Sequence, residues 1–124
     1  MKADAAIHAT PPVFDPAQLA RALDNLIVNA LRHAPSGTEV VVRARAAVSE
    51  DGERLRLEVI DNGPGVNAAE RVRIFEPFVT GRPDGSGLGL AVVREIASAH
   101  DGRAYLADDS NVTRFVIDLP CRPY

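Results

Sequence analysis

The stretch DGSGLGL, residues 84–90, has a glycine at every second position and leads directly into LAVVREIASA, residues 90–99, which is apolar with helical spacing. A glycine-rich turn at the start of a helix exposes backbone N–H groups beside the positive end of the helix dipole, and this arrangement binds phosphate oxygens. Small residues also let the main chain wrap closely around a polyphosphate. The motif alone has a second interpretation, because glycine is equally common in loops that bind nothing.

Length and composition predict one globular domain. The chain has 124 residues, of which 46% are hydrophobic and 25% charged, an ordinary balance for a soluble protein with one core. The net charge of −3 shows no overall excess of positive charge of the kind that binds nucleic acid or an anionic membrane, so we expect neither as a partner. The sequence contains no signal peptide and no apolar run of membrane-spanning length. Cys121 is the single cysteine, which fits a reducing compartment or an incidental residue.

Periodicity predicts alternating helices and strands between about residues 15 and 120. Asp15, Pro16 and Gln18 are typical of a helix start, with Asp15 as the N-cap and Gln18 completing a capping box. The helix expected over residues 16–34 carries its apolar residues on one face: Leu19, Leu23, Leu26, Ile27, Ala30 and Ala34.

Two alternating runs, 40–48 and 55–59, flank the turn SEDGE and predict an antiparallel hairpin. Its first strand should present one apolar face, consisting of Val40, Val42, Ala44, Ala46 and Val48. Further expected elements are a short helix from Asn67 through Ile74, a long helix over about 88–100 ended by Gly102 in a left-handed cap, and strands at 103–107 and 112–119. Helices between half-polar strands predict an α/β fold, with an open sheet covered by helices on one face.

The segment NLIVNALRH, residues 25–33, places Asn25, Asn29 and Arg32 on one helical stripe opposite the apolar one, with His33 near its edge. A solvated face is the simplest interpretation. However, two asparagines one turn apart lower helix propensity without an obvious packing gain. A carboxamide oxygen is also a suitable ligand for Mg²⁺.

Asp61 in VIDNGPG, residues 59–65, continues the strand parity of Leu57 and Val59, so its carboxylate should point between sheet and helices. A buried carboxylate needs a donor, and the exocyclic amino group of adenine would supply one. Gly63 and Gly65 would let the backbone approach a flat ring. A plain turn is the alternative, because DNG and PG are turn dipeptides.

The order of the motifs is more specific than any single one. NxxxN on a helix, DNGPG after a strand, FEPF at 75–78 and GSGLGL at 85–90 resemble the N, G1, F and G2 boxes of the ATP-binding catalytic domain of bacterial sensor histidine kinases. These kinases belong to the Bergerat-fold (HATPase_c, GHKL) ATPases. The resemblance implies a two-layer α/β sandwich of a mixed, largely antiparallel sheet with about three helices on one face. It also implies one ATP-binding domain over residues 1–124, with an ATP lid at about 66–86.

The resemblance implies a role in binding Mg²⁺-ATP for each box. Asn29 matches the asparagine that ligates Mg²⁺, Asp61 the residue that binds adenine, and Thr113 a residue that reaches adenine through water, although an inward threonine on a strand is also an ordinary core residue. Phe75 and Phe78 match an apolar anchor of the lid that docks or releases with nucleotide. The other matched positions are those near the phosphates or the metal, Asn25, Arg32, His33 and Arg82; the start of the lid, Gly63 and Gly65; and the triphosphate loop, Gly85, Ser86, Gly87, Leu88 and Gly89.

The implied activity is transfer of the γ-phosphoryl group of ATP to a histidine on a separate dimerisation domain, with a response regulator downstream. ATP-hydrolysing relatives typically carry a glutamate base where this chain has Asn25, and an amide takes no proton at neutral pH. We therefore expect the chain alone to bind Mg²⁺-ATP as a cytoplasmic monomer and to turn it over slowly.

No histidine of this chain matches the phosphoacceptor. His8 and His33 are each followed by alanine, and His100 precedes a helix end, so His100 is interpreted as a capping residue. We expect the acceptor outside this sequence, with Met1 marking the boundary of a piece of a larger or split kinase. Two alternatives stay open: an anti-sigma-factor-type serine kinase, which Asn25 disfavours, and a nucleotide-sensing module without transfer.

Overall fold

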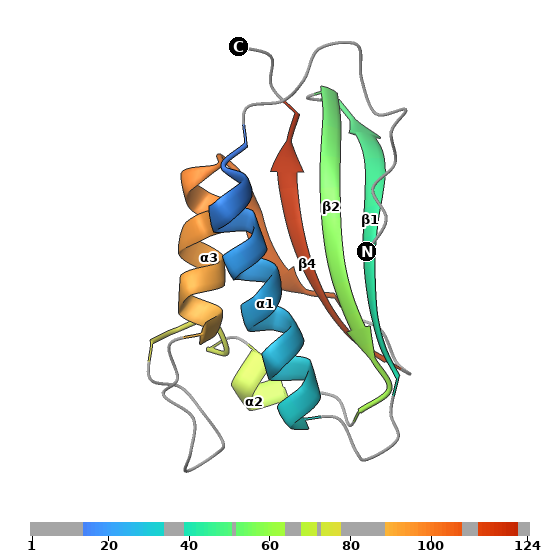
Figure 1. The fold of residues 1–124 in the computed structure, drawn as a ribbon, viewed down its shortest axis with the longest axis vertical. Coiled ribbons are helices and arrows are strands. Elements are labelled where there is room, and N and C mark those ends of the chain that lie inside the picture. The colour runs from blue at the N-terminus through green and yellow to red at the C-terminus, as the bar shows by residue number, and fades with distance from the viewer. Residues whose placement is uncertain are drawn as a thin grey trace.

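The computed structural model describes residues 14–33, 39–50, 52–63, 68–71, 73–77, 89–107 and 112–121. Its elements form two layers, with helices on one face of a single sheet, and this confirms the predicted α/β sandwich (Figure 1). They are α1 Pro16–His33, β1 Val40–Ser49, β2 Gly52–Asp61, α2 Ala68–Arg71, α3 Gly89–Ala99, β3 Arg103–Leu106 and β4 Thr113–Pro120.

The four strands lie in the order β1-β2-β4-β3, and every neighbouring pair is antiparallel. The sheet of the described residues is therefore antiparallel throughout, and the resemblance implied a mixed, largely antiparallel one. The predicted hairpin is confirmed, with Ser49 paired to Gly52 at its turn.

The core lies between the sheet and the paired helices α1 and α3 (Figure 1). The predicted apolar face of α1 is buried at Leu19, Leu23, Leu26 and Ala30. In β1 the predicted apolar face is only partly covered, because Ala46 is exposed and Val48 is 84% exposed. β1 is one of the two edge strands of the described sheet, and only its first half packs against the core formed by the helices.

The predicted N-cap of α1 at Asp15 is confirmed, but the predicted capping box is not complete. Oδ1 of Asp15 accepts hydrogen bonds from the backbone N–H groups of Ala17 (3.1 Å) and Gln18 (3.2 Å). The second half of the capping box is wrong: the backbone N–H of Asp15 donates to Nε2 of His100 at 3.0 Å. Because Nε2 accepts, Nδ1 carries the ring proton and donates to the carbonyl of Ile96 at 2.8 Å. His100 thus caps α3, as expected, and also joins its end to the start of α1.

The end of α3 corrects the prediction for Gly102. The residue in the left-handed conformation is Asp101, with φ of 60°, and the N–H groups of Gly102 and Asp101 return to the carbonyls of Ala97 (2.9 Å) and Ser98 (3.0 Å). Gly102 is needed for another reason. A Cβ there would overlap the carbonyl oxygen of Asp118 and lie 2.7 Å from Cδ2 of Leu119.

The short helix is also shorter than predicted. α2 ends at Arg71, and residues 73–77 form successive turns through the hydrogen bonds from Arg73 N to Glu70 O and from Glu76 N to Arg73 O, both 2.9 Å. Ile74 and Phe75 pack against the core from these turns. The backbone is therefore no longer helical where the side chains of Ile74 and Phe75 pack against the core.

The face of the sheet away from the helices contains two buried carboxylates. Glu58 is fully buried and pairs with Arg43 (Nε–Oε1 2.7 Å) and Arg114 (Nη1–Oε2 2.5 Å). Asp118 is 3% exposed and pairs with Arg54 and Arg56. Burial disfavours the charged form of Glu58, but hydrogen bonds from Arg43 and Arg114 and their charges outweigh this effect and hold its pKa below the ordinary value of 4.5.

Gly102→Ala is expected to lower the free energy of unfolding by about 2 kcal/mol, because the new Cβ overlaps the main chain of β4. Urea unfolding followed by circular dichroism measures this. Gly89→Ala is the matched control, since a Cβ there has no neighbour within 4 Å. Equal stability of Gly102→Ala and the native sequence would contradict the packing of Gly102 against β4.

Glu58→Gln is expected to destabilise the fold at neutral pH, and the difference should shrink as the pH falls below about 4.5. The lowered folded pKa means that ionised Glu58 stabilises the fold above its unfolded pKa and that this contribution disappears as the pH falls through the folded value. Unfolding curves at a series of pH values test this, with Glu95→Gln on the exposed side of α3 as control. A pH-independent difference would exclude the proposed role of these ion pairs.

Candidate functional site

Asn25, from the polar stripe of α1, contacts the glycine-rich segment. Its Nδ2 donates to the carbonyl of Gly89, the first residue of α3, at 3.2 Å. This bond joins the middle of α1 to the first residue of α3. Asn25 therefore holds the start of α3 in place, a role that the spacing of the asparagines alone did not indicate.

Asn29 and Arg32 follow Asn25 along α1. Asn29 is half-buried and Arg32 is exposed, and neither forms a hydrogen bond within the described ranges. A half-buried carboxamide that has no hydrogen-bond partner among the described residues is suited to accept a ligand or a metal ion. His33 is the last residue of α1, and its side chain lies outside the described part of the chain.

Asp61 and Thr113 lie opposite each other at the end of β2 and the start of β4. Both face the helices, as predicted, with exposures of 3% and 7%. Oδ1 of Asp61 accepts the N–H of Gly63 at 2.7 Å, so the turn supplies one donor. The second oxygen of Asp61 has no hydrogen-bond partner among the residues described here. Because an unsatisfied buried carboxylate oxygen is costly, it is the expected contact for an N–H group of a ligand.

The segment after the turn at Gly63 is attached to the sheet at two points. Nη2 of Arg71 in α2 donates to the carbonyls of Leu106 (3.3 Å) and Ala107 (3.4 Å), at the end of β3. The ring of Phe75 lies edge-on to that of Phe115 in β4, with centroids 6.0 Å apart. The apolar contact of Phe75 agrees with its predicted anchoring role. Sequence reasoning missed Arg71, because an arginine in a short polar helix has the pattern of a solvated residue.

These elements converge at one end of the sandwich. The last turns of α1, the end of β2, the start of β4 and the start of α3 all lie at the lower end of Figure 1, where α2 also lies. The remaining predicted site residues fall outside the described residues, as does Phe78; they are Gly65, Arg82, Gly85, Ser86, Gly87 and Leu88.

Within the described ranges, His, Cys, Asp and Glu side chains nowhere gather in groups of three or more that could hold a metal ion. Among the helices described, none combines the length and the apolar character needed to cross a membrane.

Comparison with known proteins gives a family match over residues 14–123, described as histidine kinase-, DNA gyrase B- and HSP90-like ATPase. The alginate biosynthesis sensor protein KinB of Pseudomonas aeruginosa is 41% identical over 110 residues, which cover 86% of this chain and 18% of KinB. This chain therefore spans less than a fifth of that relative.

Two solved structures are similar in both sequence and fold. The mycobacterial sensor histidine kinase MprB is 35% identical with a TM-score of 0.73, covering 93% of this chain and 81% of that one. Full-length ShkA in complex with AMPPNP is 32% identical with a TM-score of 0.71, covering 93% of this chain and 24% of that one.

Arg71→Gln is expected to increase hydrogen exchange in residues 68–77, because it removes the hydrogen bonds to the end of β3. If the free energy of local opening falls by about 1 kcal/mol, exchange becomes about fivefold faster. Mass spectrometry of peptides covering this segment measures it. Arg73→Gln is the matched control, since Arg73 is exposed and pairs only with Glu76 three residues away. Equal exchange in both variants would show that Arg71 does not anchor the segment.

Proposed function

The chain belongs to the family of histidine kinase-, DNA gyrase B- and HSP90-like ATPases, and from this premise we propose that it is the ATP-binding catalytic domain of a sensor histidine kinase. Such a domain binds Mg²⁺-ATP and donates the γ-phosphoryl group to a histidine on another domain. The observation that carries the proposal is the buried carboxylate of Asp61, which keeps one oxygen for a ligand N–H at the end of the sandwich where α3 begins. The sensor kinases among the relatives favour this function over the anti-sigma-factor-type alternative.

Adenine is the group that the end of β2 would bind. An N–H donor that approaches the second oxygen of Asp61 gives this oxygen of a 3% exposed carboxylate a hydrogen bond that none of the described residues supplies. Thr113 lies directly opposite and places a hydroxyl within reach of the same ring or of a bridging water. Adenine offers its exocyclic amino group at C6 as this donor, and guanine has a carbonyl oxygen at the same position.

The polar stripe of α1 would bind the phosphates and Mg²⁺. Asn29 supplies a carboxamide oxygen as metal ligand, and Arg32 supplies a positive charge one turn further on. When bound, Mg²⁺ neutralises charge on the phosphate oxygens. His33 and Arg82 are proposed as further contacts near the phosphates or the metal. Gly85, Ser86, Gly87, Leu88 and Gly89 are proposed as the triphosphate loop, which leads into the helix that Asn25 holds at Gly89.

Asn25 also bears on the choice of acceptor. Its amide donates to Gly89 and cannot remove a proton, so this chain provides no base for a water or serine nucleophile at that position. A neutral imidazole attacks without losing a proton first, and the chain then contributes positioning and charge stabilisation. A histidine acceptor therefore fits this site better than serine or water does.

The proposal extends to the larger system. We propose residues 1–124 as one catalytic domain with the lid at about 66–86, beginning at Gly63 and Gly65 and anchored through Arg71 and Phe75. Its partners are a histidine-bearing dimerisation domain and, downstream, a response regulator. Its location is cytoplasmic.

Asp61→Asn is expected to weaken ATP binding at least about tenfold and to reduce the preference for adenine over guanine, because the amide replaces part of an acceptor with a donor. Asn29→Asp should change the dependence of binding on Mg²⁺, since it adds a charge at the ligand position. Calorimetry with ATP and GTP, with and without Mg²⁺, measures both. Asp24→Asn on the exposed side of α1 is the control and should bind like the native chain. Unchanged affinity and base preference in Asp61→Asn would refute the assignment.

Transfer of labelled phosphate from ATP to a separately added histidine-bearing dimerisation domain of a sensor histidine kinase tests the activity. We expect label that survives alkali and is lost in acid, as phosphohistidine requires, and only slow phosphate release without the added domain. Rapid hydrolysis by the chain alone, or label on serine, would contradict the proposed acceptor.

A further inference from the structure

The face of the sheet away from the helices is rich in arginine. The strand register places on it two arginines each from β1 and β2 and one each from β3 and β4. Together with two carboxylates, Glu58 and Asp118, they form what we call the guanidinium face: Arg43, Arg45, Arg54, Arg56, Arg103 and Arg114.

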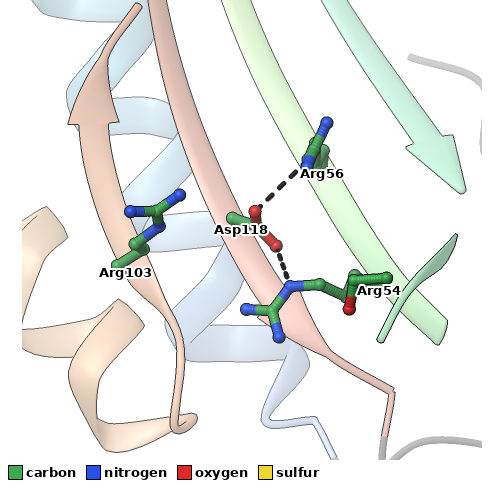
Figure 2. A pocket seen from close by; sticks show the side chains of 5 residues that line it. Arg54, Arg56, Arg103 and Asp118 are labelled. Atoms are coloured by element: carbon green, nitrogen blue, oxygen red, sulfur yellow. Dashed lines mark hydrogen bonds and ion pairs between the residues drawn. The ribbon is translucent and has the colours of Figure 1, made fainter. Parts of the chain in front are cut away.

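The carboxylates of this face lie beneath the guanidinium groups. Glu58 and Asp118 have side-chain exposures of 0% and 3%, whereas Arg43 and Arg45 are 46% and 51% exposed. Asp118 accepts from Nε of Arg54 at 2.6 Å and from Nε of Arg56 at 3.2 Å (Figure 2). Because these bonds use Nε, terminal N–H groups of both arginines remain for other acceptors.

The charge of this face is opposite to that of the rest of the chain. Six arginines and two carboxylates leave a charge of +4 on the face, so the remainder carries −7 in a chain whose net charge is −3. The positive charge of the face attracts an acidic partner to it.

A hollow of about 300 Å³ opens in this face between β2, β4 and β3, lined by Ser49, Arg54, Arg56, Arg103 and Asp118. Arg103 lies on the other side of Asp118 from Arg56 (Figure 2), and its guanidinium is stacked 4.7 Å from the centre of the Tyr105 ring. The hollow therefore holds three cations and one carboxylate. The ion pairs and the aromatic stacking hold the guanidinium groups in position, which lowers the entropy cost of binding a further carboxylate.

We propose that the guanidinium face docks an acidic segment of a partner protein, with an aspartate or glutamate side chain of that segment in the hollow. Guanidinium groups bind carboxylates through charge-assisted hydrogen bonds, and Asp118 already shows one carboxylate that accepts from two arginines of this face. A short acidic segment stays within the positive face. A nucleic acid, with its long continuous charge, would extend onto the negative remainder of the chain.

A fluorescent oligoglutamate peptide of about 6 residues, short enough to stay within the positive face, is titrated with the full chain at low salt as the test. We expect saturable binding that the triple variant Arg45→Gln, Arg56→Gln, Arg103→Gln weakens about tenfold, as for three partly exposed ion pairs. The matched control is Arg21→Gln, Arg73→Gln, Arg94→Gln, which removes the same charge from exposed positions outside the face and should weaken binding less than about threefold. Circular dichroism verifies that both variants fold.

Two further binding measurements distinguish failure of this proposal from failure of the proposed function. Asp61→Asn, which is aimed at nucleotide binding, should bind the peptide like the native chain, and saturating Mg²⁺-ATP should not displace the peptide. Absence of peptide binding, equal weakening in the two triple variants, or tighter binding of a single-stranded DNA of equal charge would overturn the docking of an acidic segment.

Discussion

The register of the central strand β2 is the constraint on which both faces of the sheet depend. Side chains alternate along a strand, so a shift of one residue would exchange its two faces. In the observed register Val59 packs in the core and Asp61 lies opposite Thr113, while Glu58 faces the arginines on the other side. A slip would place Glu58 against the helices and leave Asp61 among the arginines. The candidate nucleotide contact and the guanidinium face are therefore positioned by the same pairing.

The helices are tied together by polar contacts as well as by the apolar core. At one end, the ring of His100 connects the carboxyl end of α3 to the amino end of α1. Towards the other end, Asn25 of α1 holds the first residue of α3. Two such bonds restrict sliding of one helix along the other, and this keeps the start of α3 at a constant position relative to the end of β2. A site assembled from separate segments requires such restriction to keep its geometry.

Much of the fold was predictable because it follows from local periodicity. The apolar spacing from Leu19 to Ala30 predicted α1, and the alternation around Leu57 predicted the hairpin and the inward direction of Asp61. The errors occurred where distant contacts override a local signal. Gln18 completes no capping box, because the backbone N–H of Asp15 donates to His100. The helix α2 ends early, where Ile74 and Phe75 pack against the core. Gly102 is required because β4 lies too close for a Cβ, and not because of its own backbone angle.

The sequence by itself determined which residues form helices and strands, which face of each element is apolar, and, through the order of four motifs, the family resemblance that the comparisons confirm. Only the tertiary structure decided that Asn25 bonds to Gly89, that Arg71 anchors the segment after Gly63, and that five arginines from three strands pair with two buried carboxylates. The physical reason is that periodicity is set by neighbours within a few residues. The partner of a polar side chain is set by strand register and helix packing, which bring together residues as many as 85 positions apart.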